Sequence, residues 1–163
     1  MTLRRMTLVG LALALLTLAP SPARADIVGF LGSNLTPSSQ PIYGAALSIN
    51  ILVVCLEFEF ANSPEDLSRG LPGQITGMAS VQFVTPTGRV QAYGGAGIGA
   101  GWESLTGFNS ALRTARSIGG GVKIGLAGPL GVRVDYRVMT LNNSLGVDTA
   151  TRQRFYVGLN LHF

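Results

Sequence analysis

Apolar and polar residues alternate along most of the chain after residue 25. The last ten residues show the pattern most clearly: one set of alternate positions is apolar, namely Phe155, Val157, Leu159, Leu161 and Phe163. The intervening set is Arg154, Tyr156, Gly158, Asn160 and His162. Successive side chains of a strand point to opposite faces. The period of two therefore predicts a β-strand with one apolar face.

Seven further segments share this period. In 132–138 Arg133, Asp135 and Arg137 oppose valines and Tyr136, and in 54–60 Glu57 and Glu59 oppose apolar residues. Residues 118–126 place Lys123 among glycines, opposite branched apolar residues. Weaker alternation covers 26–34, 42–50, 74–84 and 90–102. Eight segments of this length are typical of the tilted strands that cross a membrane.

The segments between these strands alternate in length. Short turns are predicted near 50–52, 85–88 and 127–131, and longer polar connections at 33–41, 61–73, 103–116 and 141–151. This order predicts an up-and-down meander with the short turns at one end and the long loops at the other. Ser63-Pro64-Glu65-Asp66 has the residue types of a helix start, so 61–73 is either a helical turn or an irregular loop.

Three observations predict that the apolar face points outward into lipid. Glycines crowd the polar face, at Gly95, Gly97, Gly99, Gly101, Gly119, Gly121 and Gly125, where they make room in a narrow lumen. Large aromatic residues lie at strand ends on the apolar face, namely Phe60, Phe83, Trp102 and Phe163, as interfacial girdles do. The polar face carries charges of both signs, which we predict to form one neutralising network in the lumen: Glu57, Glu59, Lys123, Arg133, Asp135, Arg137, Arg152 and Arg154.

Residues 1–25 have the pattern of a secretory signal peptide. Arg4 and Arg5 precede an uncharged stretch, and Ala23-Arg24-Ala25 fits the small-x-small cleavage rule. The apolar core of 8–19 is too short to span a bilayer. We therefore predict an exported chain whose β-barrel domain is 26–163.

Composition removes several classes of function. Twelve basic residues face eight acidic ones; the leader holds three of the twelve, so nine remain and the exported chain is close to neutral. Nucleic acid is therefore not a predicted partner. Cys55 is the single cysteine, so it forms no intramolecular disulfide, and with one histidine the chain has no zinc cluster.

The terminal phenylalanine, with apolar residues at alternate positions before it, resembles the sorting signal of bacterial outer-membrane β-barrels. The signal comprises Phe155, Val157, Leu159, Leu161 and Phe163. The whole chain from residue 26 is similar to the OmpA-type transmembrane barrel family, and residues 131–137 are similar to its next-to-last strands. The resemblance implies an all-β, eight-stranded antiparallel up-and-down transmembrane β-barrel in the outer membrane. It also implies outer-membrane lipid and the barrel-assembly machinery as partners, and short turns on the periplasmic side. No peptidoglycan-binding domain follows Phe163, so a cell-wall tether is not implied.

Four features could carry chemistry, and each has a simpler structural interpretation. The glycine run 94–101 lies in a strand pattern and lacks the helix that a dinucleotide loop needs. His162 is the only histidine and has no serine two positions away, which lipid A deacylases resembling this family carry. Glu57 and Glu59 are expected to form one side of a salt-bridge ladder and not a hydrolytic pair. Cys55 is expected to be a small side chain that fills space in the lumen. No catalytic, cofactor or metal site is predicted.

A structural or surface-interaction role with a plugged lumen is the function that this pattern favours. The connection 103–116 and its flank hold Phe108, Leu112, Arg113 and Arg116, which suit a partner or an anionic lipid head group. Three alternatives stay open: a narrow porin-like channel, a lipid-A-modifying barrel enzyme, and a soluble lipocalin-like binding barrel with its apolar face inward.

Overall fold

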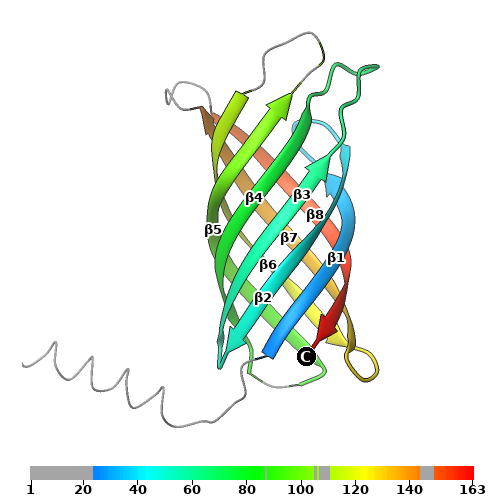
Figure 1. Cartoon of the computed structure of the whole chain (residues 1–163), viewed down its shortest axis with the longest axis vertical. Coiled ribbons are helices and arrows are strands. Elements are labelled where there is room, and N and C mark those ends of the chain that lie inside the picture. The colour runs from blue at the N-terminus through cyan, green and yellow to red at the C-terminus, as the bar shows by residue number, and fades with distance from the viewer. Residues whose placement is uncertain (1–23, 87, 105, 107–110, 144–148) are drawn as a thin grey trace, which may run out of the picture.

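The chain forms a single closed antiparallel β-barrel (Figure 1). The computed structural model describes residues 24–86, 88–104, 106, 111–143 and 149–163. Its eight strands are β1 (Arg24–Asn34), β2 (Gln40–Ile51), β3 (Val54–Ser63), β4 (Gly73–Val84), β5 (Val90–Ser104), β6 (Ala111–Gly125), β7 (Leu130–Asn143) and β8 (Thr149–His162). Each strand pairs with its neighbours in sequence, and β1 also pairs with β8. The predicted all-β, eight-stranded up-and-down barrel is confirmed.

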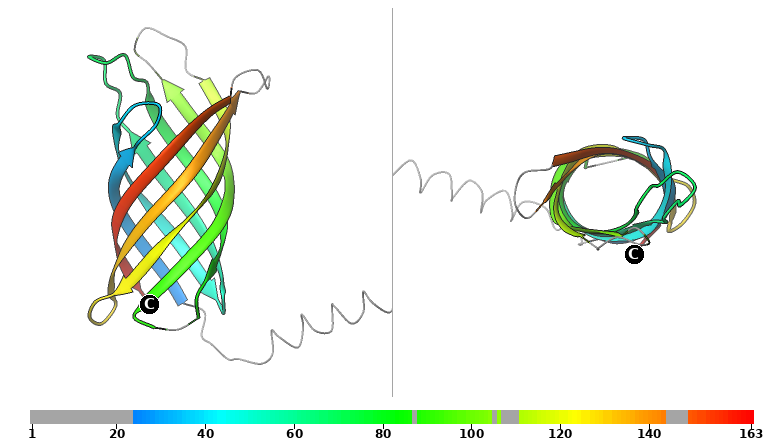
Figure 2. Two further views of the ribbon diagram at one scale, coloured as in Figure 1. Left: turned by 180° about the vertical axis from the view of Figure 1, so that it is seen from behind. Right: turned by 90° about the horizontal axis from the view of Figure 1, so that it is seen from above.

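The strand register explains why distant residues meet inside the barrel. Residues that lie opposite each other in the register can be followed once around the sheet, through Arg24, Asn50, Cys55, Gln82, Gly95, Gly119, Arg137, Arg154 and Asn34. The path returns to β1 ten residues further along, at 34 rather than 24. A stagger of this size requires strands that tilt strongly against the barrel axis, as Figures 1 and 2 show.

The two faces of the sheet have opposite character. Outward side chains are apolar and exposed: Leu31 is 71% exposed and Phe58 67%. Inward side chains include Arg133 and Asp135, both 0% exposed. In a soluble barrel the apolar side chains would be the buried ones. The predicted orientation, with the apolar face outward, is confirmed, and it is the orientation of transmembrane barrels.

Short turns and long connections lie at opposite ends of the barrel (Figure 1). The C-terminus lies at the end with the short turns, which we call the turn end; the other is the loop end. The β2–β3 turn consists of Leu52 and Val53, and Leu52 has a positive φ of 59°. Two-residue hairpins favour positive φ because it matches the twist of the strands.

The strands extend further toward the loop end than the alternation indicated. The predicted connection 103–116 is wrong in its bounds, because β6 begins at Ala111 and thus contains Arg113 and Arg116. The connections 61–73 and 141–151 are shorter than predicted for the same reason. Toward the loop end, apolar residues such as Ala115, Met139 and Leu141 face inward while Arg116 and Thr140 face outward. The alternation with an apolar outer face is therefore lost, although the backbone pairing continues.

Residues 64–72 form an irregular loop and not a helical turn. Asp66 pairs with Leu71 in an isolated bridge around a turn. The Asp66 carboxylate accepts hydrogen bonds from Ser68 Oγ at 2.5 Å and Arg69 Nε at 2.6 Å. Both contacts hold the pKa of Asp66 below its ordinary value.

Of the predicted leader, residues 1–23 lie outside the described residues, whereas Arg24 and Ala25 are the first positions of β1. Within the described residues, no helix has the length and apolar character needed to cross a membrane.

Candidate functional site

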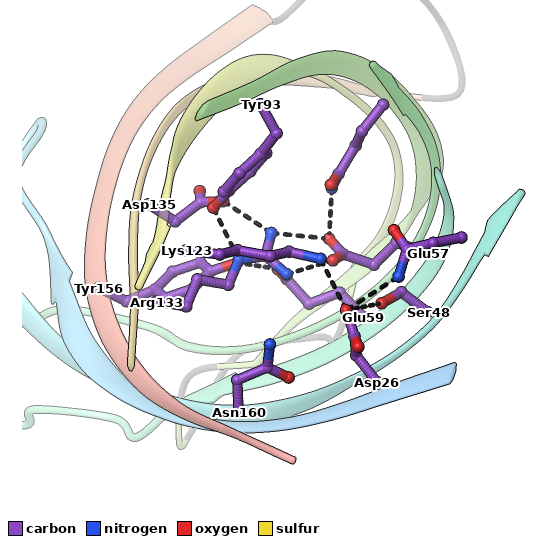
Figure 3. Close-up of polar contacts among 12 residues, drawn as sticks. Asp26, Ser48, Glu57, Glu59, Tyr93, Lys123, Arg133, Asp135, Tyr156 and Asn160 are labelled. Atoms are coloured by element: carbon purple, nitrogen blue, oxygen red, sulfur yellow. Dashed lines mark hydrogen bonds and ion pairs between the residues drawn. The ribbon is translucent and has the colours of Figure 1, made fainter. Parts of the chain in front are cut away.

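The lumen is the candidate site, and its central layer is a dense cluster of charges (Figure 3). Arg133, from β7, forms an ion pair with Glu57, from β3, using both carboxylate oxygens. Arg137, four residues further along β7, places Nη2 3.2 Å from Glu57 Oε1. One carboxylate therefore faces two guanidinium groups from the opposite side of the barrel.

Asp135 is held between the same two arginines. Its Oδ2 accepts a hydrogen bond from Arg133 Nη2 at 2.9 Å, and its Oδ1 accepts one from Arg137 Nε at 2.8 Å. The Tyr93 hydroxyl, from β5, donates to Asp135 Oδ2 and accepts from Arg133 Nε at 2.7 Å. The Arg133 guanidinium also lies 4.6 Å from the centre of the Tyr93 ring, a cation–π distance.

Glu59 extends the cluster toward the loop end. It lies 3.0 Å from Arg137 Nη1 and 3.1 Å from Arg154 Nη1, and it accepts a hydrogen bond from the Tyr156 hydroxyl at 3.0 Å. The central cluster thus contains three acids and three arginines, all at most 5% exposed: Glu57, Glu59, Asp135, Arg133, Arg137 and Arg154. Such burial of charge is tolerable because every ion is paired and hydrogen-bonded.

A second cluster lies at the turn end. Asp26 accepts hydrogen bonds from Lys123 Nζ at 2.8 Å and from Asn50 Nδ2 at 3.0 Å. His162 Nδ1 lies 2.7 Å from the other oxygen of Asp26. These residues line a polar pocket of about 350 Å³ that also includes Arg89.

A third cluster lies at the loop end, where Glu103 pairs with Arg113 at 2.6 Å and Arg152 at 2.7 Å. Buried apolar side chains lie in the lumen on the same side of the central cluster, namely Met78, Ala115, Met139 and Leu141. The eight charges that the sequence assigns to one network are thus distributed over three clusters. Six residues of the eight are central, whereas Lys123 is at the turn end and Arg152 at the loop end.

Sequence reasoning did not assign three of the main participants: Asp26, Tyr93 and Tyr156. Their position in the alternation places each of them on the polar face of its strand. A large tyrosine on a face otherwise occupied by glycine and charge was the available signal, because its hydroxyl needs a partner when buried.

Several glycines of β5 and β6 leave no empty space beside them. A Cβ placed on Gly121 would lie 2.0 Å from the Val134 carbonyl oxygen and 2.6 Å from the Tyr93 hydroxyl. Neighbouring groups therefore occupy the space that these glycines leave. The cavity beside them, lined by Ser80, Gln82 and Tyr93 among others, has a volume of about 10 Å³, the scale of one water molecule.

The remaining candidates have the following environments. His162 contacts Asp26 and Asn160, and neither residue carries the hydroxyl or thiol that a histidine base activates. Cys55 is a fully buried free thiol. Among the described residues no group of acid, histidine or cysteine side chains is placed to hold a metal ion. Phe108 lies outside the described residues.

The predicted assembly residues lie on β8 and at the C-terminus, all exposed on the outer face: Phe155, Val157, Leu159, Leu161 and Phe163. This placement leaves them accessible along the seam between β1 and β8, where the sheet closes.

The fold resembles solved outer-membrane β-barrels. The N-terminal β-barrel domain of Pseudomonas aeruginosa OprF matches with a TM-score of 0.63 and 14% identity, over 86% of this chain and 97% of that one. Neisserial surface protein A matches with a TM-score of 0.59 and 15% identity, over 86% and 96%. The outer membrane enzyme PagL matches with a TM-score of 0.54 and 15% identity, over 83% and 98%.

No protein-family model matches the chain, and no curated protein matches it in sequence. At these identities the likeness shows the architecture alone. The chain has the fold of a small eight-stranded outer-membrane β-barrel.

Proposed function

We propose that this protein is an integral outer-membrane barrel with a structural or surface-interaction role, exported by its leader, and that it is not an enzyme. The observation that carries the proposal is the closure of the lumen by the central cluster. Glu57, Arg133 and Asp135 are at most 1% exposed, so these side chains are almost completely shielded from solvent in the middle of the barrel. An eight-stranded lumen is just wide enough to be filled by side chains.

Because the lumen is filled, the surfaces that can interact with other molecules are those on the outside of the barrel. The outer face supplies an apolar belt for outer-membrane lipid, and the loop end supplies the surface on which a partner can bind. Neisserial surface protein A, whose name places it at a cell surface, is one of the solved barrels of this fold. The β8 residues that end in Phe163 are suited to recognition by the barrel-assembly machinery, since they are exposed along one strand.

Outer-membrane isolation after expression of the full chain tests this proposal. We expect a heat-modifiable, protease-resistant band in the outer-membrane fraction and no unitary conductance in planar bilayers. A soluble periplasmic product would refute the membrane assignment. Steady ion conductance in the unmodified protein would replace the structural role with a narrow channel.

The same cells test the catalytic alternative. His162 lies 2.7 Å from Asp26 beside the turn-end pocket, and PagL shows that this fold can support an enzyme. We expect the masses of lipid A species to be identical in cells that express the protein, its His162→Asn variant or neither. A species that depends on His162 would refute the non-catalytic role.

A further inference from the structure

The outer face carries one charged side chain among the described outward-facing strand positions: Arg116, on β6. The side chain is exposed, whereas its neighbour Ala115 is 0% exposed and points into the lumen. Arg116 makes no hydrogen bond or ion pair with any described residue. Because no described residue pairs with this lipid-facing cation, a membrane lipid is the candidate partner.

Arg116 lies at the edge of the apolar belt on the side of β7 and β8, whereas on β6 and β5 the exposed Leu112 and Trp102 continue the belt toward the loop end. Toward the turn end, the outward residues of β6 are Ile118, Gly120, Val122 and Ile124. On β7, the outward residues are apolar up to Val138, and the next one, Thr140, pairs with Arg116. On β8, the apolar residues end at Phe155 and Gln153 follows. On β7 and β8 the apolar residues therefore end beside Arg116, and the nearby Trp102 is an aromatic residue of the kind that gathers at the membrane–water interface.

An apolar hollow begins beside Arg116 on its other flank. Ile98 of β5 pairs with Arg116 and is 67% exposed. Ile98 also lines a hollow of about 410 Å³ on the outer face, together with Ala96, Ala79, Val81, Phe58 and Leu56. Alanines at its floor and a phenylalanine at its wall form a shallow depression suited to a hydrocarbon chain.

We propose that Arg116 is the head-group anchor of a binding site for a phosphorylated lipid of the outer leaflet. The Arg116 guanidinium and the Thr140 hydroxyl bind the phosphate, and an acyl chain follows Ile98 into the hollow. Guanidinium groups bind phosphate through two parallel charge-assisted hydrogen bonds. The site rests on the proposed function, because it requires the barrel to lie in a membrane.

Quenching of a tryptophan beside the site measures lipid choice directly. Trp102 is the only tryptophan, so Trp102→Phe with Ile118→Trp moves the reporter next to Arg116 on the same outer face. This reporter protein is inserted into phosphatidylcholine vesicles that contain a minority of brominated phosphatidylglycerol, brominated phosphatidic acid or brominated phosphatidylcholine. A basic residue near a charged membrane surface contributes about 1 kcal/mol. We therefore expect an approximately fivefold preference for the anionic lipids, and Arg116→Gln should abolish it.

Two variants separate the site from a general charge effect. Arg116→Lys should retain most of the preference for phosphatidylglycerol and reduce that for phosphatidic acid, whose exposed phosphate suits a guanidinium better. Arg69→Gln removes the same charge at the loop end, at a residue that is paired with Asp66 and lies off the apolar belt. This control should keep the full preference.

The outcomes distinguish this site from the proposed function. Equal quenching by all three lipids, or a preference that survives in Arg116→Gln, would overturn the lipid site while leaving the barrel intact. Displacement of the lipid by millimolar inorganic phosphate would assign the position to a free anion instead. Failure to insert, seen as the loss of heat modifiability, would refute the proposed function itself.

Discussion

In this barrel the charged residues are buried in the central cluster and the apolar residues are exposed in the outer belt, the reverse of a soluble protein. The two regions also differ in how strictly each position requires a particular residue. Arg133 is 0% exposed inside, whereas Leu31 is 71% exposed outside. Contact with lipid requires only that the outer side chains be apolar, so one branched side chain can replace another there. Charged side chains in the central cluster are shielded from bulk water, so other side chains must stabilise them. Each inner residue therefore depends on particular partners, and substitution should cost far more inside than outside.

The largest expected effect comes from removing one ion of the central cluster. Glu57→Gln keeps the size of the side chain but leaves Arg133 and Arg137 without a carboxylate that both contact. Loss of one partner of a buried ion pair costs about 3–5 kcal/mol. We expect a decrease of this size in the free energy of unfolding, measured by urea titration of the barrel refolded in lipid vesicles.

A double variant tests whether the penalty arises from the unpaired charge. Adding Arg133→Met to Glu57→Gln removes both charges of the pair, so the double variant should be less destabilised than the sum of the two single variants. Strict additivity would mean that the two side chains contribute independently and that the cluster is not a coupled unit.

A charge placed in the outer belt should have the next largest effect. Phe58 lies in the middle of β3 and is 67% exposed. Phe58→Arg should cost about 2–4 kcal/mol, because lysine or arginine at the middle of a membrane strand is destabilising by that amount. Phe58→Leu is the matched control and should change the free energy of unfolding little. A neutral Phe58→Arg would show that this face does not contact hydrocarbon.

Alanine substitution at two glycines compares the faces without any charge. Gly121 faces the lumen, where an added Cβ would meet Val134 and Tyr93, whereas nothing lies within 4 Å of a Cβ on the outward-facing Gly29. Gly121→Ala should cost about 1–3 kcal/mol through overpacking. Gly29→Ala should be neutral or slightly stabilising. Equal urea midpoints for the two variants would contradict a tightly packed lumen.

The sequence predicts the strands and which residues share a face from the period of two, and it predicts which face is outward from the positions of glycines, aromatic residues and charges. It does not predict which lumen residues touch. Arg137 contacts Glu57 across 80 positions of sequence, and that contact depends on the stagger accumulated around the whole sheet. The separation of Lys123 and Arg152 from the central cluster has the same cause. Arg113 and Arg116 were assigned to a loop because polar and apolar residues are mixed on both faces at the start of β6, so the alternation does not mark the strand there.

The smallest expected effect comes from the exposed pair of Asp66 and Arg69, which sharpens the contrast with the lumen. Hydrogen bonds from Ser68 and Arg69 hold the pKa of Asp66 below its ordinary value. The stabilisation is therefore present above the pKa of the unfolded chain, about 3.9 for aspartate, and is lost as the pH falls through the lower folded pKa. Solvent screens this contact, so Asp66→Asn should lower the urea midpoint at neutral pH far less than Glu57→Gln does. The small difference between wild type and Asp66→Asn should shrink further toward about pH 3. A loss comparable to that of Glu57→Gln would mean that burial is not what makes the central ion pairs costly to break.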